Sequence, residues 1–117
     1  MPKVLRLKKR DDFLRVKNAN KSVAASGLVL QVAPGKIEDN SSLRLGFTVT
    51  SKLGNAVKRN RIKRRLRAAA REVMDKSAAA GKDYVIIGRF RAIDREFASL
   101  IKDLKYTLHN TGTYKKS

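Results

Sequence analysis

The stretch KLGNAVKRNRIKRRLR, residues 52–67, decides the fold that we expect for this chain. Between Lys58 and Arg67, seven of the ten residues are Lys or Arg. At about 100° per residue, the apolar positions of a helix here fall on one narrow stripe, made of Ile62, Leu66, Ala69 and Val73. The sequence therefore predicts a long helix, Asn55 to Met74, that docks by this stripe and exposes a basic surface.

Counter-charges are nearly absent from this helix. Glu72 is the only acidic residue between Lys52 and Met74. A solvated structural face would mix charges of both signs, as residues 94–103 do. The missing acidic partners favour a nucleic-acid surface, and the excess of Arg suits bidentate phosphate contacts and stacking on bases. Asn55, which follows Gly54, is suited to cap the helix start.

The elements before the basic helix follow from hydrophobic periodicity. A helix is predicted at Arg10–Asn18, with acidic residues in its first turn that complement the helix dipole. Leu28–Val32 reads as a strand, with a short piece near Val23 before it. Leu43–Val49 alternates with period two, which is typical of a strand with one buried face. A turn over residues 34–42 is expected to join these two strands as an antiparallel hairpin.

The elements after the basic helix complete the pattern. We expect the helix to fray through residues 77–80, with Gly81 in a left-handed conformation at its terminus. Tyr84–Ile87 is a continuous apolar run, typical of a strand buried on both faces. Asp94 is predicted to cap a last helix, and the tail 113–117 is expected to be flexible. The apolar stripe of that helix comprises Phe97, Leu100, Ile101, Leu104 and Leu108.

The fold class that this order predicts is α+β, an α/β sandwich in which helices cover a small mixed sheet. The element order is helix, strands, helix, strand, helix, in a single domain over residues 1–117. The net charge is 28 − 10 = +18, which favours a polyanionic partner. An anionic membrane is the competing partner, but the basic helix lacks the Trp, Phe or several Leu of a surface-lying helix. The chain has no cysteine, and we expect a cytoplasmic protein that binds no membrane.

The run from Lys52 to Arg67 resembles the signature of the bacterial ribonuclease P protein subunit. That family carries an Arg-Asn-Arg core, here residues 59–61, followed by Lys-Arg-x-x-Arg, here residues 63–67. The resemblance extends to the first helix, to the strand at 44–49 and to the strand at 83–89. It implies a left-handed βαβ crossover through the basic helix, where the general rule favours right-handed ones. It also implies two partners: a catalytic RNA and the 5′ leader of precursor tRNA.

Two sets of site residues follow from the resemblance. The catalytic-RNA surface is expected to comprise Lys52, Asn55, Lys58, Arg59, Asn60, Arg61, Lys63, Arg64, Arg67 and Arg71. A leader-binding cleft between the first helix and the sheet is expected to comprise Lys9, Phe13, Val16, Lys17, Val29, Gln31 and Thr48. The chain departs from the family at Lys17 and Gln31, where aromatic residues are common. It also has Ser51-Lys52 before Leu53-Gly54, where the family often has two lysines. The cleft should therefore stack bases less and rely more on charge and hydrogen bonds.

No catalytic or metal-binding residue is expected in the chain itself. Hydrolysis of a phosphodiester by a protein needs clustered carboxylates for metals, or a paired general acid and base. His109 is the only histidine, and its place near the end of the last helix suggests that it caps carbonyls or faces solvent. No cofactor is expected on the protein, and the Mg²⁺ would belong to the RNA partner.

Three alternatives remain open at this point. A ribosomal protein would bind ribosomal RNA and leave tRNA maturation unaffected. A stand-alone nuclease would cleave without added RNA. A nucleoid protein would bind duplex DNA with comparable affinity, although we expect no DNA partner.

Overall fold

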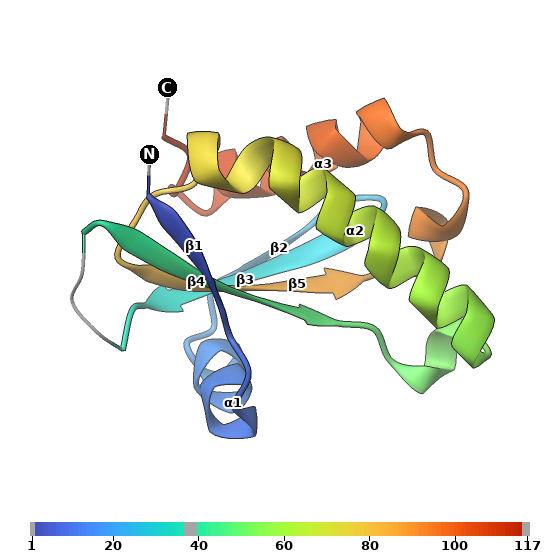
Figure 1. The fold of residues 1–117 in the computed structure, drawn as a ribbon, viewed down its shortest axis with the longest axis horizontal. Helices are drawn as coiled ribbons and strands as arrows, with labels where there is room; N and C mark the ends of the chain where they lie inside the picture. The colour runs from blue at the N-terminus through green and yellow to red at the C-terminus, as the bar shows by residue number, and fades with distance from the viewer. Residues whose placement is uncertain (1, 37–39, 116–117) are drawn as a thin grey trace.

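Five strands form one mixed sheet in the computed structural model, which describes residues 2–36 and 40–115 (Figure 1). The strands are β1 Lys3–Arg6, β2 Ser22–Ala24, β3 Leu28–Pro34, β4 Ser42–Thr48 and β5 Lys82–Gly88. Their order across the sheet is β1-β4-β5-β3-β2. The β4 strand pairs in parallel with β1 and β5, while β3 pairs antiparallel with β5 and β2.

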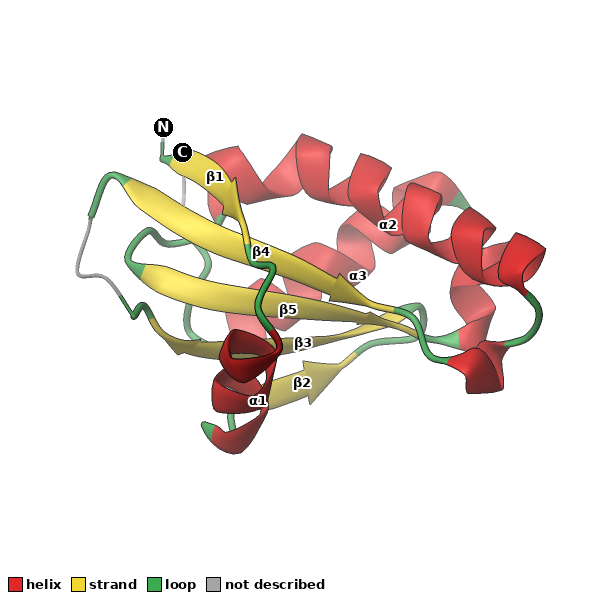
Figure 2. Ribbon diagram, turned by 60° about the horizontal axis from the view of Figure 1, so that its bottom comes forward, coloured by secondary structure: helices red, strands yellow, loops and turns green. Residues whose placement is uncertain are grey.

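Helices cover both faces of this sheet (Figure 2). They are α1 Arg10–Asn18, α2 Ala56–Ser77 and α3 Phe97–Asn110, with short 3-10 helices η1 at Ser51–Leu53 and η2 at Phe90–Ile93. The larger core cluster joins alternate sheet residues to the apolar stripes of α2 and α3. A smaller cluster beneath α1 joins Leu7 and Val16 to Ala33 and Val85 on the opposite face. The α+β sandwich is therefore confirmed.

The predicted hairpin between β3 and β4 is wrong. These strands run in opposite directions, but β5 lies between them and pairs with both. The reason lies in β5 itself, since Tyr84, Val85 and Ile86 are all buried and fill the centre of the sheet on both faces. Part of the predicted turn, residues 37–39, lies outside the described residues.

The β4–α2–β5 connection is a crossover between adjacent parallel strands. It agrees with the βαβ unit expected from the family resemblance, and its left-handed sense stays a prediction. The unit places α2 diagonally across the sheet (Figure 1). The sequence did not predict β1, because all four of its residues are exposed and it lacks a buried face of its own.

The first helix is confirmed at Arg10–Asn18, and α2 runs three residues further than predicted, to Ser77. Residues after α2 do not fray as expected, since Ala78 is buried and forms a bridge with Tyr114. Gly81 does have a positive φ of 76°, but it lies beyond this bridge rather than at the helix terminus. In the described part of the tail, Thr113 is buried and the Lys115 amide donates to the Ser77 carbonyl. The flexibility expected for the tail stays a prediction. Residues 116 and 117 lie outside the described part.

The start of α3 also differs from the prediction. Asp94 does not cap this helix, which begins at Phe97 with Glu96 at the N-cap position and no side-chain cap. Instead Asp94 follows η2, whose turn occupies the residues just after β5. The predicted apolar stripe is largely confirmed, because Leu100, Leu104 and Leu108 are fully buried while Phe97 stays 39% exposed.

Candidate nucleic-acid interface

The start of α2 is fixed by the two residues that interrupt the strand pattern. Gly54 has a φ of 124°, which a residue with a side chain rarely adopts. Asn55 is the N-cap, and its Oδ1 accepts a hydrogen bond from the Lys58 amide at 3.0 Å. The predicted cap is confirmed. Asn55 therefore serves the helix start, whatever further contact its amide nitrogen makes.

The docking stripe of α2 is confirmed in full. Ile62, Leu66, Ala69 and Val73 are each at most 1% exposed, and they pack on the face of the sheet that α2 covers. Arg and Lys side chains occupy most of the remaining circumference. Apart from Asn55, the predicted RNA-binding residues and Arg65 form three groups.

The first group contacts the η2 turn. The Arg61 Nε donates to the Ile93 carbonyl at 2.8 Å, and the Arg65 Nε donates to the Ala92 carbonyl at 3.0 Å. Arg65 also donates to the Arg95 carbonyl. These contacts at positions i and i+4 attach the η2 turn to α2. The sequence did not predict this structural use of Arg61, whose part in RNA binding stays a prediction.

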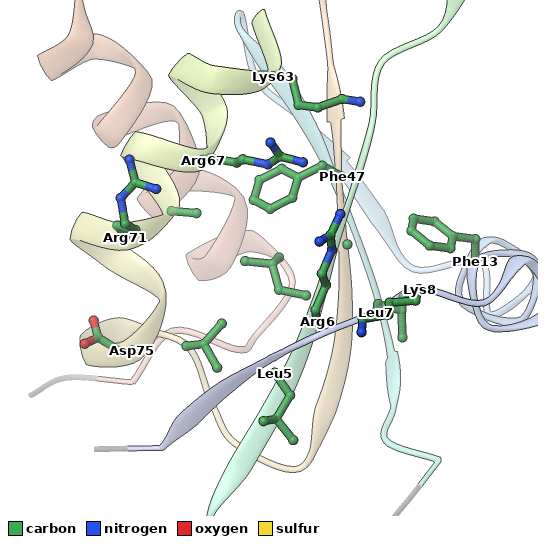
Figure 3. A pocket seen from close by; sticks show the side chains of 14 residues that line it. Leu5, Arg6, Leu7, Lys8, Phe13, Phe47, Lys63, Arg67, Arg71 and Asp75 are labelled. Atoms are coloured by element: carbon green, nitrogen blue, oxygen red, sulfur yellow. The ribbon is translucent and has the colours of Figure 1, made fainter. Parts of the chain in front are cut away.

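The second group lines a groove between α2 and the strands β1 and β4. Lys63, Arg67 and Arg71 lie one turn apart and face this groove, which has a volume of about 960 Å³ (Figure 3). The Arg67 guanidinium carbon lies 5.9 Å from the centroid of the Phe47 ring, within cation–π distance. The third group comprises the remaining predicted RNA-binding residues: Lys52, Lys58, Asn60 and Arg64, which are exposed, and Arg59, which is half-buried.

On the opposite face of the sheet, three neighbouring strands present one row of side chains beside α1. Ile87 on β5 pairs with Val29 on β3 and with Thr48 on β4. All three residues are half-buried. The sequence predicted Val29 and Thr48 but missed Ile87 between them. Ile87 lies two residues after Val85, so both side chains point to the same face of the sheet. The sequence could have placed Ile87 beside Val29 and Thr48 only if β5 were known to lie between β3 and β4.

The other predicted cleft residues do not all reach this surface. Phe13 and Gln31 are half-buried, while Lys9 and Lys17 are exposed at α1. Val16 is 0% exposed and packs in the small core beneath α1. The prediction that Val16 lines the cleft is therefore wrong. It lies one turn after Phe13 on the inner side of the helix, where burial excludes a ligand.

Gly46 makes room for Phe13. A β-carbon added at Gly46 would lie 2.5 Å from the Phe13 Cζ and 3.2 Å from the Leu7 Cβ. We expect Gly46→Ala to push the Phe13 ring off the sheet and to lower the free energy of unfolding by about 1 to 3 kcal/mol, the usual effect of overpacking. Urea unfolding measures the loss. Unchanged stability would contradict this packing.

A cluster of four charged residues fastens α1 to the sheet. Arg44 binds Asp83 through Nε at 2.9 Å and through Nη2 at 2.6 Å, and it also binds both carboxylate oxygens of Asp12. Arg15 from α1 binds Asp83 as well. Burial alone would raise the pKa of Asp83, but the hydrogen bonds from Arg44 and Arg15 outweigh it and hold that pKa below its usual range. Asp12 thus does more than complement the helix dipole, because it is a buried ion-pair partner.

The described residues form no cluster of side chains that could bind a metal ion. Within residues 2–36 and 40–115, no three His, Asp or Glu side chains come close enough to share a metal ion. His109 stacks on Tyr114 with the ring centroids 3.8 Å apart. No helix in that part of the chain is long and apolar enough to span a membrane.

A basic helix laid across a mixed sheet, with a row of half-buried side chains beside α1 on the opposite face, defines a small α+β RNA-binding protein. The family model for ribonuclease P matches residues 1–112. The chain belongs to the ribonuclease P protein family.

Sequence relatives agree with this assignment. The ribonuclease P protein component of Paramagnetospirillum magneticum is 48% identical over 114 residues, covering 96% of this chain and 86% of that protein. The component from Bacillus velezensis is 39% identical over 117 residues, covering 100% and 97%.

Solved structures agree as well. The ribonuclease P protein of Staphylococcus aureus superposes with a TM-score of 0.75 at 34% identity, covering 94% of this chain and 97% of that one. The protein from Thermotoga maritima gives a TM-score of 0.69 at 28% identity, covering 85% and 90%.

Proposed function

We propose that this chain is the protein subunit of a ribonuclease P holoenzyme, in which a catalytic RNA removes the 5′ leader of precursor tRNA. The observation that carries the proposal is the surface of α2. Its inner stripe is wholly buried while its outer side is basic and almost free of acidic residues, in a chain of the ribonuclease P protein family. Such a surface neutralises phosphates and releases condensed counterions.

The two faces of the sheet suggest a division of labour. The exposed cations of α2 bind the catalytic RNA. The row formed by Val29, Ile87 and Thr48, with Phe13 beside it, receives the leader on the other face. Phe13 can stack on one base, and Lys17 and Gln31 add charge and hydrogen bonds, since no second aromatic stands at those positions. One protein then holds both RNAs, each on its own face.

The hydrolytic step belongs to the catalytic RNA and the Mg²⁺ that it binds. The described part of the chain offers no clustered carboxylates for such an ion. The protein contributes through electrostatics and position, because its net charge of +18 offsets the repulsion between two polyanions. It therefore lowers the Mg²⁺ concentration that the two RNAs need in order to associate. We propose a cytoplasmic location, where these RNAs are found.

Reconstitution tests the proposal. A precursor tRNA with a 5′ leader is incubated at low Mg²⁺ with bacterial ribonuclease P RNA, with and without this protein. We expect cleavage at the mature 5′ end only when both are present. The protein alone is the control, and cleavage by it would reveal an active site in the chain.

If the mixture fails to cleave while the RNA alone remains active at high Mg²⁺, the proposal is wrong. Binding to ribosomal RNA would then become the leading function. Comparable affinity for duplex DNA would instead indicate a nucleoid protein.

A further inference from the structure

The groove between α2, β1 and β4 contains three cations of the proposed catalytic-RNA surface, Lys63, Arg67 and Arg71, and it extends to Phe13 of the proposed leader surface. The apolar base of this groove has no part in either surface as proposed so far. Its floor is apolar and contains Leu45 and Phe47 from β4 and Ala70 from α2. Its volume of about 960 Å³ lies at the upper end of the ~300–1,000 Å³ range of small-ligand sites. A nucleotide therefore fits in it.

Five cations surround this floor. Arg6 and Lys8 come from β1 and the residues after it, and Lys63, Arg67 and Arg71 come from α2. Asp75 is the only acidic residue of the lining. Within the part of the chain that the structure describes, none of the five cations forms an ion pair. The groove is thus a concentration of uncompensated positive charge around an apolar base.

Phe47 gives this groove a flat aromatic surface. The period of β4 places its ring on the α2 side of the sheet, where it is half-buried beside the larger core. The Arg67 guanidinium lies over it, and Figure 3 shows Arg67 and Phe47 together at the centre of the groove. An aromatic ring and a guanidinium plane are the two kinds of surface on which nucleic-acid bases stack.

We propose that this groove binds one unpaired nucleotide of an RNA, with its base stacked on Phe47 and Arg67 and its flanking phosphates held by Lys63 and Arg6. The proposal rests on the proposed function in so far as that function makes RNA the partner. It adds a base-recognition site to a surface that phosphate contacts alone would otherwise explain. An RNA strand that crosses α2 could turn one base inward at this point.

An extended acidic peptide is the alternative occupant, because the outer edge of β1 has no strand beside it in the described part of the chain. The nucleotide is favoured since the cations gather around an aromatic ring, which a peptide of carboxylates does not require. The test below separates the two.

The test uses the full chain and two hexamers of equal charge, hexaadenylate RNA and an abasic ribose-phosphate hexamer, with binding measured by fluorescence anisotropy. We expect Phe47→Leu to weaken hexaadenylate binding about tenfold, within the range that base–aromatic stacking supplies. Binding of the abasic hexamer should not change. Phe97→Leu, at a half-exposed aromatic outside the groove, is the matched control and should leave both affinities unchanged.

A second variant tests base stacking independently, in case Phe47→Leu disturbs the fold. Arg67→Lys keeps the charge of an exposed residue but removes the planar group, so we expect it to weaken hexaadenylate binding several-fold and the abasic hexamer hardly at all. Equal loss for both hexamers, or no loss for either, overturns the proposal. If hexaglutamate displaces hexaadenylate from the natural chain but not from Phe47→Leu, the groove is a peptide site and the proposal is wrong. Failure here with successful reconstituted cleavage would remove this site and leave the proposed function intact.

Discussion

Replacing Arg59, Lys63 and Arg67 together with alanine is expected to lower the affinity for the catalytic RNA about 100-fold at physiological salt. Each phosphate that a cation neutralises adds about 0.7 to 0.9 to the slope of log affinity against log salt. Removing three such cations should therefore reduce that slope by about 2 to 3. Filter binding over a salt series at fixed Mg²⁺ measures both quantities.

The fold should survive this triple substitution. None of the three residues belongs to the buried stripe that contains Ile62 and Leu66, and alanine has the highest helix propensity. Arg67 gives up its position over Phe47, which at an exposed site contributes only about 0.5 to 1 kcal/mol. The helical circular-dichroism signal should stay unchanged, and a large fall in melting temperature would show that the wrong face of α2 was assigned.

A charge-matched control distinguishes specific RNA binding by α2 from the general attraction of RNA to a positively charged protein. Lys102, Lys105 and Lys115 are exposed and lie on or after α3. Replacing these three with alanine removes the same net charge from another part of the molecule. We expect only a few-fold loss of RNA affinity in this control. An equal loss in both variants would mean that the basic side of α2 has no special role.

The second large effect is expected at Asp83. Asp83→Asn should lower the free energy of unfolding by about 3 to 5 kcal/mol, the usual effect of breaking a buried ion pair, because it leaves the Arg44 guanidinium without its main partner. Asp83 is 1% exposed and Arg44 only 20%, so water replaces the missing carboxylate only in part. Arg15, at 35% exposed, contributes less because solvent screens it. Urea unfolding at pH 7 measures the effect.

The stability that Asp83 contributes should depend on pH in a definite direction. The folded-state pKa of Asp83 is lowered by Arg44 and Arg15 against the opposing effect of burial. Its carboxylate therefore stabilises the fold above the unfolded pKa of about 3.9, and this contribution is lost as pH falls through the folded value. The stability gap between the natural chain and Asp83→Asn should be widest near neutral pH and should narrow in acid.

Asp11 supplies the matched control for this experiment. It lies in the first turn of α1 beside Asp12, but it is exposed and takes no part in the cluster. Asp11→Asn should change stability by less than about 1 kcal/mol. If Asp83→Asn behaves like this control, or if its deficit is the same at pH 3 and pH 7, the cluster does not fasten α1 to the sheet.

Much of the fold could be predicted because short-range sequence patterns determine it. The period of apolar residues predicted α1 to the residue and the docking stripe of α2 in full. The cap at Asn55 followed from side-chain chemistry alone. The basic side of α2 needed no structure either, because a helix whose inner stripe is known must present its other residues outward.

The candidate site was predicted less completely. Val16 and Phe13 share a helix and a similar chemistry, yet only the packing beneath α1 shows that Val16 is inaccessible. Ile87 was missed because its place between Val29 and Thr48 depends on which strands are neighbours. Arg61 and Arg65 look like their basic neighbours in sequence, and only the position of the η2 turn shows that they bind its carbonyls.

The sequence by itself determined the helices, the alternating strands, the charge of α2 and the family to which the chain belongs. These properties depend on residues within a few positions of one another, where periodicity and capping act. Only the tertiary structure decided that β5 enters between β3 and β4, that β1 joins the sheet edge, and that Arg44 meets Asp12 and Asp83. Those outcomes depend on contacts between segments far apart in the chain, and the burial that selects among them belongs to the whole fold rather than to any one segment.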